Sequence, residues 1–393
     1  MPDLRLTREN TLPAEGLVGT FIGRAWTAGG IPGPTPVLVA PDGVFSLAPA
    51  APTISALLEL TDPVEVARRC TGERLGDVTT LLENTPFDRR APDRPWLLGP
   101  ADLQAVKACG VTFLKSMLER VVESLATGDP GAALSTRTTL EAEVGESLSR
   151  VRPGSPEAAR VKEVLVSRSL WSPFMEVGIG PDAEIFTKTQ PMSTVGTGDE
   201  VGILPTSTWN NPEPEVVLAI NSRGRIVGAT IGNDVNIRDM VGRSTLLACR
   251  AKDNRASCAV GPFIRLFDAT FTLDDVRRMI LRMTIEGDDG FALTGTHSMA
   301  GISRDVLDLA AQTVGPHNQY PDGVLLFTGT SIAPSEDREG PGKGFTHHIG
   351  DLVTISSPQL GSLINRVNHT DRIPPWTLGA GRLLEILTAR QRE

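Results

Sequence analysis

NNPEPEVVLAINSRGRIVGATIGNDV, residues 210–235, contains two runs rich in Val, Ile and Thr on either side of Ser222-Arg223-Gly224. β-branched residues favour strands, and glycine supplies the permissive backbone of a tight turn, so the pattern predicts a β-hairpin. A turn centred near Arg223 and Gly224 sets Glu213 opposite Asp234. Glu215 lies two residues beyond Glu213, and side chains two apart in a strand point to the same face.

Three carboxylates at one end of one hairpin face repel each other unless a positive charge lies among them. A hard divalent cation with oxygen ligands is the natural compensation, so Glu213, Glu215 and Asp234 are predicted to be metal ligands. Mg²⁺ suits an all-oxygen site with room for water, and Mn²⁺ and Ca²⁺ are the alternatives. The spacing alone fits a second interpretation equally well, in which a shifted register scatters three acids over a solvated hairpin end.

The composition is that of a globular protein, since 40% of the 393 residues are hydrophobic and 22% are charged. A net charge of −9 argues against nucleic acid or an anionic membrane as the main partner. Four cysteines without CxxC spacing and five histidines without HExxH exclude the common zinc sites. With no secretory signal and no apolar run near the ~18 residues of a membrane span, we expect a cytoplasmic protein.

Frequent glycine and proline, 39 and 30 residues, predict many turns and short strands rather than a helical protein. A proline-rich linker predicts a small N-terminal β-rich domain, residues 1–95, followed by a larger domain, residues 96–393. The larger domain is predicted to change from strand to helix at about Leu114 and to contain a second helix, 156–171, with Ser155 as its N-cap. The expected fold class is α+β and β-rich.

The hairpin resembles the metal-binding signature of the fumarylacetoacetate hydrolase superfamily, an ExE pair followed by a strand and a GND-type aspartate. Further matches follow in order over about 270 residues: GVTF at 110–113, EIFTK at 184–188, NDVNIRD at 233–239, TGTS at 328–331, GDLVTI at 350–355 and LGSLINRV at 360–367. The resemblance implies a mixed β-sandwich roll with a smaller N-terminal domain, a small-molecule 2-keto acid substrate, and a homodimer or homotetramer.

Within that superfamily the sequence is most similar to the sugar-acid dehydratases. The matching segments are WNNPEPEVVL at 209–218, GNDVN at 232–236, AKDNRASCAVGPF at 251–263, QYPDGVLLF at 319–327 and GPGKGFTHH at 340–348. This resemblance implies Mg²⁺-dependent dehydration of a 2-keto-3-deoxypentonate, of xylonate or arabinonate type, to 2,5-dioxopentanoate in sugar-acid catabolism.

The resemblance also implies roles for single residues. Lys252 stands at the position of the active-site lysine, where it would stabilise an enolate or transfer the C3 proton, with a pKa lowered by a neighbouring cation. Glu184 and Glu119 are candidate acid–base partners for the departing hydroxyl. The candidate substrate-binding residues are Phe113, Lys188, Arg238 and Thr330. Lys188 is equally well interpreted as a surface lysine of a strand.

Ser116 departs from the pattern of the hydrolases and decarboxylases of the superfamily. Those proteins carry a histidine at this place, with an acid three residues later, to activate water. Glu119 retains the acid, but a serine without a nearby base is a poor activator of water, which favours elimination over hydrolysis. The alternative for Ser116 and Glu119 is an ordinary polar face of a helix.

Two other functions stay open from the sequence. The first is a hydrolase or decarboxylase of 2,4-diketo acids of acylpyruvate or fumarylacetoacetate type. The second is a non-catalytic protein that binds a small molecule. His347-His348 follows a glycine-rich loop and is interpreted as an exposed pair at the start of a strand.

Overall fold

The computed structural model describes residues 2–125, 151–167, 171–332, 334, 336–341 and 343–392. The strands in these residues are β1 Thr20–Thr27, β2 Gly33–Ala40, β3 Gly43–Ser46, β4 Arg74–Gly76, β5 Trp96–Leu98, β6 Ala105–Gly110, β7 Glu184–Thr189, β8 Glu200–Ile203, β9 Asn210–Asn211, β10 Pro214–Ile220, β11 Ile226–Asp234, β12 Asn236–Ile237, β13 Cys258–Leu266, β14 Ile280–Glu286, β15 Ala292–Ser298, β16 Val324–Phe327, β17 Leu352–Ser357 and β18 Gly361–His369.

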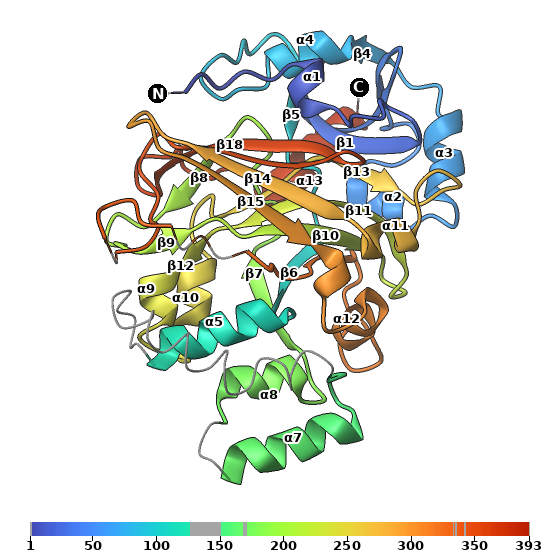
Figure 1. Cartoon of the computed structure of the whole chain (residues 1–393). Helices are drawn as coiled ribbons and strands as arrows, with labels where there is room; N and C mark the ends of the chain where they lie inside the picture. The colour runs from blue at the N-terminus through green and yellow to red at the C-terminus, as the bar shows by residue number, and fades with distance from the viewer. Residues whose placement is uncertain are drawn as a thin grey trace.

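The helices lie mostly outside the sheets (Figure 1). They are α1 Arg8–Thr11, α2 Ile54–Leu58, α3 Pro63–Arg69, α4 Val78–Glu83, α5 Leu114–Leu125, α7 Pro156–Ser167, α8 Pro173–Ile179, α9 Arg238–Val241, α10 Ala248–Lys252, α11 Leu273–Arg277, α12 Val306–Thr313 and α13 Ala380–Arg390, with 3₁₀ turns at Thr245–Leu247 and Met299–Gly301. None of the helices in the described part of the chain combines the length and apolar character that crossing a membrane requires.

Two large sheets form the centre of the molecule. Within the described residues the larger sheet has the strand order β4-β3-β2-β1-β13-β11-β10-β16-β6-β7, with β5 paired to β1, and the smaller has the order β15-β14-β17-β18-β8. The smaller sheet buries alternate residues, such as Leu281, Met283 and Ile285 of β14, against β10 and β11. The predicted α+β, β-rich sandwich roll is confirmed.

β10 and β11 are buried along almost their whole length. One face of this hairpin packs on the smaller sheet, and the other contacts a second apolar cluster that includes α2. A strand covered on both faces is a rigid support, because little of it is free to move into solvent. The predicted ligands therefore lie at the end of the most enclosed hairpin of the fold.

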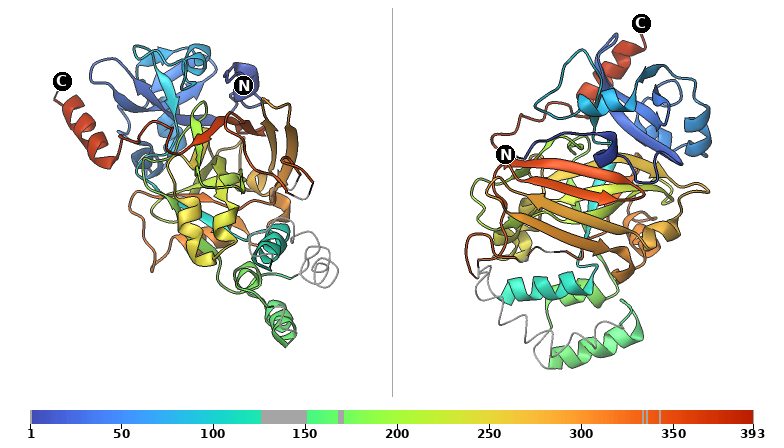
Figure 2. Two further views of the ribbon diagram at one scale, coloured as in Figure 1. Left: turned by 90° about the vertical axis from the view of Figure 1, so that its left-hand side faces the viewer. Right: turned by 45° about the horizontal axis from the view of Figure 1, so that its top comes forward.

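The N-terminal segment joins the larger sheet. β1 pairs with β13, with Phe21 opposite Arg265, and also with β5. The sheet thus continues across residue 95, and the division into residues 1–95 and 96–393 stays a prediction. Figure 2 shows this N-terminal part, with α13 beside it, at the end of the molecule opposite α5, α7 and α8.

Helices α5, α7 and α8 pack on one another below the sheets through side chains such as Met117, Leu165 and Met175 (Figure 1). The predicted change to helix at Leu114 is confirmed. The Ser155 side chain accepts a hydrogen bond from the Ala158 backbone at 3.2 Å, as expected of an N-cap. The second helix is described over Pro156–Ser167, Trp171 at its predicted end is not helical, and α8 was not predicted.

Candidate metal and substrate site

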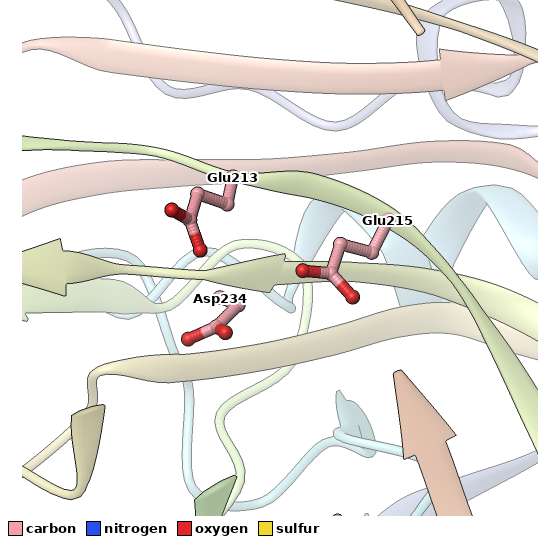
Figure 3. A group of neighbouring side chains, drawn as sticks. All are labelled: Glu213, Glu215 and Asp234. Atoms are coloured by element: carbon pink, nitrogen blue, oxygen red, sulfur yellow. The ribbon is translucent and has the colours of Figure 1, made fainter. Parts of the chain in front are cut away.

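The hairpin has the predicted register. Pro214 pairs with Asn233 and Glu215 with Gly232, which sets Glu213 opposite Asp234, whose backbone N–H donates to the Glu213 carbonyl at 3.0 Å. The three carboxylates point toward one another from two adjacent strands (Figure 3). Each offers an oxygen within 4.8 Å of the others, and all three side chains are buried. The alternative of scattered, solvated acids is therefore wrong.

Cations from three elements surround two of these acids. Lys252 of α10 pairs with Glu213 and lies 2.8 Å from Asp234 Oδ2. Arg120 of α5 lies 3.0 Å from Glu213 Oε1, and Lys188 of β7 lies 2.9 Å from Asp234 Oδ1. Glu215 instead accepts the Gly329 backbone N–H at 2.6 Å, and no lysine or arginine among the described residues pairs with it.

The electrostatics of the three acids differ accordingly. Burial raises the pKa of Glu215 well above its usual value, and the charges of Asp234 and Glu213 raise it further. Burial also acts to raise the pKa of Asp234, but Lys188 and Lys252 outweigh it and hold that pKa below its usual value. The negative charge at Glu215 is thus the least compensated. A donor set of three close, buried carboxylates with one uncompensated charge fits a hard divalent cation.

For Lys252 the neighbouring charges, rather than burial, decide the direction of the pKa shift. Burial alone would lower its pKa, but Asp234 and Glu213 outweigh burial and raise it. The lowered pKa of Lys252 that was expected from the sequence requires a bound cation next to the lysine. With the protein groups alone, Lys252 is a fixed positive charge rather than a base.

The carboxylates lie in a cleft of about 770 Å³, a volume that includes the solvent at its mouth. Glu184, at the start of β7, lines this cleft opposite Gly110. A Cβ at position 110 would lie 1.9 Å from Glu184 Oε2, so glycine is what allows the carboxylate to lie across β6. Burial raises the pKa of Glu184, although Arg120 and Lys252 oppose the shift. A carboxyl group of this kind can exchange protons with a ligand in the cleft.

Most of the residues singled out in the sequence meet here. The ones that line the cleft are Glu213, Glu215, Asp234, Lys252, Glu184, Ser116, Arg238 and Thr330. Glu119 belongs to α5, but its side chain is outside the described part of the structure. Arg238 stacks over the Trp209 ring at 4.3 Å and donates to the Pro334 carbonyl at 3.1 Å, so its guanidinium is held in place.

Ser116 uses its hydroxyl proton within its own helix. Its Oγ donates to the Phe113 carbonyl at 3.0 Å, which leaves only lone pairs to face the cleft. Ser116 therefore accepts hydrogen bonds from a ligand and has no proton free to give. This agrees with the expectation that it does not activate water.

Two predicted substrate contacts are placed elsewhere. Phe113 is buried, with its ring edge-on to His297 at a centroid distance of 5.0 Å, and does not line the cleft. Lys188 is fully buried behind Asp234, where it also donates to the Lys252 carbonyl. Neither side chain is positioned to touch a ligand in the cleft, and Lys188 is not a surface lysine either. The sequence does not say which face of β7 is covered, and tertiary packing decides it.

Arg120, Asn211 and Asn236 also line the cleft and were not predicted from the sequence. Arg120 lies one helical turn after Ser116, so the i, i+4 spacing indicates a shared face and would have found it. Asn211 and Asn236 pair with each other in the ladder of β9 and β12. They continue the register of the hairpin by one more residue pair on the face that carries Glu213, Glu215 and Asp234, here called the acidic face. The two-residue period of the sequence contains this information.

The histidine pair was interpreted wrongly in part. His347 is buried, and its Nδ1 lies 3.1 Å from Asp351 Oδ2. Arg338 binds the same carboxylate through two nitrogens, at 2.6 and 2.8 Å. No local sequence pattern indicates this ion cluster, because its members come together only when the loop before β17 folds back.

Solved structures define the class of fold. The chain is similar to the apo form of a 2-keto-3-deoxy-D-arabinonate dehydratase, with a TM-score of 0.62 and 20% identity over 89% of this chain and 99% of that one. A second structure, of a 2-keto-3-deoxy-D-arabinonate dehydratase complexed with magnesium and 2,5-dioxopentanoate, gives a TM-score of 0.60 and 21% identity over 90% of this chain and 100% of that one. At this level of identity the likeness shows a shared fold.

Sequence comparison then identifies a family match. Residues 175–368 match the family described as fumarylacetoacetate (FAA) hydrolase C-terminal. A Haloferax volcanii protein named probable 2-keto-3-deoxyxylonate dehydratase is 32% identical over 184 residues, 47% of this chain and 60% of that protein. A Saccharolobus solfataricus protein named 2-dehydro-3-deoxy-D-arabinonate dehydratase is 32% identical over 195 residues, 48% of this chain and 60% of that protein. Residues 175–368 thus match the family that the sequence resembles, and the chain spans about 60% of the length of each of these two relatives.

Proposed function

We propose that this protein is a divalent-cation-dependent dehydratase. It converts a 2-keto-3-deoxypentonate of xylonate or arabinonate type into 2,5-dioxopentanoate in sugar-acid catabolism. The observation that carries the proposal is the buried set of three carboxylates, within 4.8 Å of one another, in a cleft that also contains Lys252 and Glu184. The names of the two relatives, and the neighbour bound to magnesium and 2,5-dioxopentanoate, support the choice of substrate.

Glu213, Glu215 and Asp234 would hold Mg²⁺, with Mn²⁺ and Ca²⁺ as alternatives. When bound, the cation supplies Lewis-acid polarisation of a 2-keto acid. Lys252 keeps a positive charge beside the same acids and stabilises the negative charge that develops when C3 loses its proton. The role as a cation follows from its raised pKa.

Glu184 is proposed as the group that removes the C3 proton, because it lines the cleft and burial raises its pKa, which makes its carboxylate a stronger base. The C4–O bond then breaks, a double bond forms between C3 and C4, and the hydroxyl leaves as water with a proton from Glu119. A proton then moves from C5 to C3 and the double bond shifts to C4–C5. The resulting enol transfers its hydroxyl proton to C4, which gives the C5 aldehyde of 2,5-dioxopentanoate. Ser116 accepts a hydrogen bond from a substrate hydroxyl, and Arg238 and Thr330 bind the carboxylate and hydroxyl groups.

The hydrolase alternative requires a base for water. The histidine that would serve is replaced by Ser116, whose proton is committed to the Phe113 carbonyl at 3.0 Å. This contact favours elimination over cleavage of an acylpyruvate. The cytoplasmic location and the homodimer or homotetramer expected from the sequence belong to the same proposal.

The test is a panel of 2-keto-3-deoxypentonates, with product measured by coupled oxidation of the semialdehyde. We expect turnover that EDTA abolishes and Mg²⁺ restores, and acylpyruvate cleavage that is slow at best. Glu119→Gln should impair dehydration, because the leaving hydroxyl loses its proton source. A preparation that cleaves an acylpyruvate faster than it dehydrates any 2-keto-3-deoxypentonate would support the hydrolase. One that binds the acids and transforms neither would support the non-catalytic binding protein.

A further inference from the structure

Two asparagines extend the acidic face of the hairpin. Asn211 and Asn236 are direct partners in the β9–β12 ladder, in the register that pairs Pro214 with Asn233. Asn211 precedes Glu213 by two residues, and Asn236 follows Asp234 by two. Because side chains two apart share a face, the asparagine rung lies beside the carboxylates and lines the same cleft.

Both amides have an oxygen without a partner. The two side chains are 0% and 1% exposed, and neither Asn211 Oδ1 nor Asn236 Oδ1 accepts a hydrogen bond within the described residues. The orientation of Asn211 is fixed, because its Nδ2 donates to the Pro212 carbonyl at 2.8 Å and a flipped amide would set two oxygens against each other. A buried acceptor without a partner is unfavourable, so a ligand that donates a hydrogen bond to it gains binding free energy.

We infer that Asn211 and Asn236 determine specificity by accepting hydrogen bonds from the hydroxyl-bearing end of the substrate. The inference rests on the proposed function and deepens it. Two residues along a strand span about 6.6 Å, a distance comparable to the length of a five-carbon acid extended from the carboxylate face. The C5 hydroxyl of a 2-keto-3-deoxypentonate is a donor that reaches this rung. An acylpyruvate has no hydroxyl there and leaves both oxygens unpaired.

The experiment compares two acids that differ by one hydroxyl group. 2-Keto-3-deoxypentonate and 4-hydroxy-2-oxopentanoate both lose the C4 hydroxyl, but only the first carries a hydroxyl at C5. For the wild type we expect kcat/KM to be roughly 10–100-fold higher for the hydroxylated acid, since the other leaves buried acceptors unpaired. In Asn211→Leu and Asn236→Leu this ratio should fall about tenfold or more, while Mg²⁺ affinity by calorimetry changes less than about twofold.

Smaller variants and a control keep the test decisive if a leucine prevents folding. Asn211→Ala and Asn236→Ala remove the same oxygens with less steric demand. Asn221→Ala is the matched control, because it removes another buried asparagine of the hairpin, at the turn and away from the cleft. It should lower stability and leave the ratio between the two acids unchanged.

Three results would overturn the inference. An unchanged ratio in the asparagine variants, with the wild type dehydrating 2-keto-3-deoxypentonate, rejects the inference and leaves the proposed function intact. If kcat/KM falls equally for both acids and Mg²⁺ binds more weakly, the two amides would instead bind water molecules that coordinate the cation. A wild type that dehydrates neither acid contradicts the proposed function itself, and the inference falls with it.

Discussion

Two ion clusters of the protein differ in whether every carboxylate has a cationic partner. In the loop cluster, formed by Arg338, Asp351, Asp289 and His347, Arg338 binds Asp351 at 2.6 and 2.8 Å and Asp289 at 3.0 and 3.1 Å. Burial acts to raise the pKa of Asp351, but hydrogen bonds from His347 and Arg338 outweigh it and lower the pKa to about 2. Within the described residues Glu215 has no cationic partner, and its pKa is raised well above the usual value by burial and by the charges of Asp234 and Glu213.

The difference separates a structural ion cluster from a binding site. Folding a chain around an uncompensated carboxylate costs stability, because desolvation is not offset by a partner. The loop cluster avoids that cost with Arg338. The acidic face retains this cost in stability, and a bound divalent cation would remove it by compensating the charge of Glu215. Unmatched buried charge is thus the feature that marks the functional cluster.

The largest effect is expected from exchanging one acid in each cluster for its amide. Glu215→Gln removes a proposed ligand, so turnover should fall by about 10⁴-fold or more and Mg²⁺ binding should be lost with it. Because it also relieves repulsion, the variant without Mg²⁺ should be no less stable than the wild type. Asp351→Asn should do the opposite, lowering stability and leaving Mg²⁺ affinity unchanged. Calorimetry and thermal unfolding measure both, and equal behaviour of the two variants would contradict the distinction.

Next come the two lysines that contact Asp234. Lys252 lies in the cleft and Lys188 lies behind it. With saturating Mg²⁺, Lys252→Met should retain metal binding and lose about 10²–10³-fold in kcat, because the stabilising charge is removed. Lys188→Met leaves the buried Asp234 with Lys252 as its remaining partner and Oδ1 without one, so it should lower the free energy of unfolding by about 1–3 kcal/mol. Near-normal turnover of Lys252→Met would move this lysine to a structural role.

The smallest effect concerns the pH dependence of the loop cluster. The pKa of Asp351 is about 2 in the folded protein and near 3.8 as a reference, so the folded state binds fewer protons between these values. Its contribution to stability, about 2 kcal/mol, is therefore complete above pH 4 and is lost as pH falls toward 2. The stability difference between wild type and Asp351→Asn, followed by denaturation across this range, should shrink with acid. A difference independent of pH would contradict the assignment.

The sequence was sufficient where a local rule decides the structure. A tight turn and the two-residue period of a strand fix which residues pair, so the register and the meeting of Glu213, Glu215 and Asp234 could be predicted. The same rule also pairs Asn211 with Asn236, although that rung was overlooked. The superfamily resemblance supplied the sandwich roll and the order of the remaining elements.

Other features depend on contacts between distant segments. The burial of Lys188 and Phe113 depends on which face of each element is covered, and the local pattern does not contain that information. His347 meets Arg338 and Asp351 only after a loop folds back. The same holds for the raised pKa of Lys252, since its value depends on two acids from another part of the chain.

The central claim, that the unmatched acidic face is a divalent-cation site, is tested most directly by crystals grown with Mn²⁺ and measured at the manganese edge. The account predicts an anomalous peak between Glu213, Glu215 and Asp234, about 2.1–2.2 Å from one oxygen of each, with Lys252 moved away from Glu213. A fully occupied peak elsewhere, with Lys252 still paired to both Glu213 and Asp234, would contradict it.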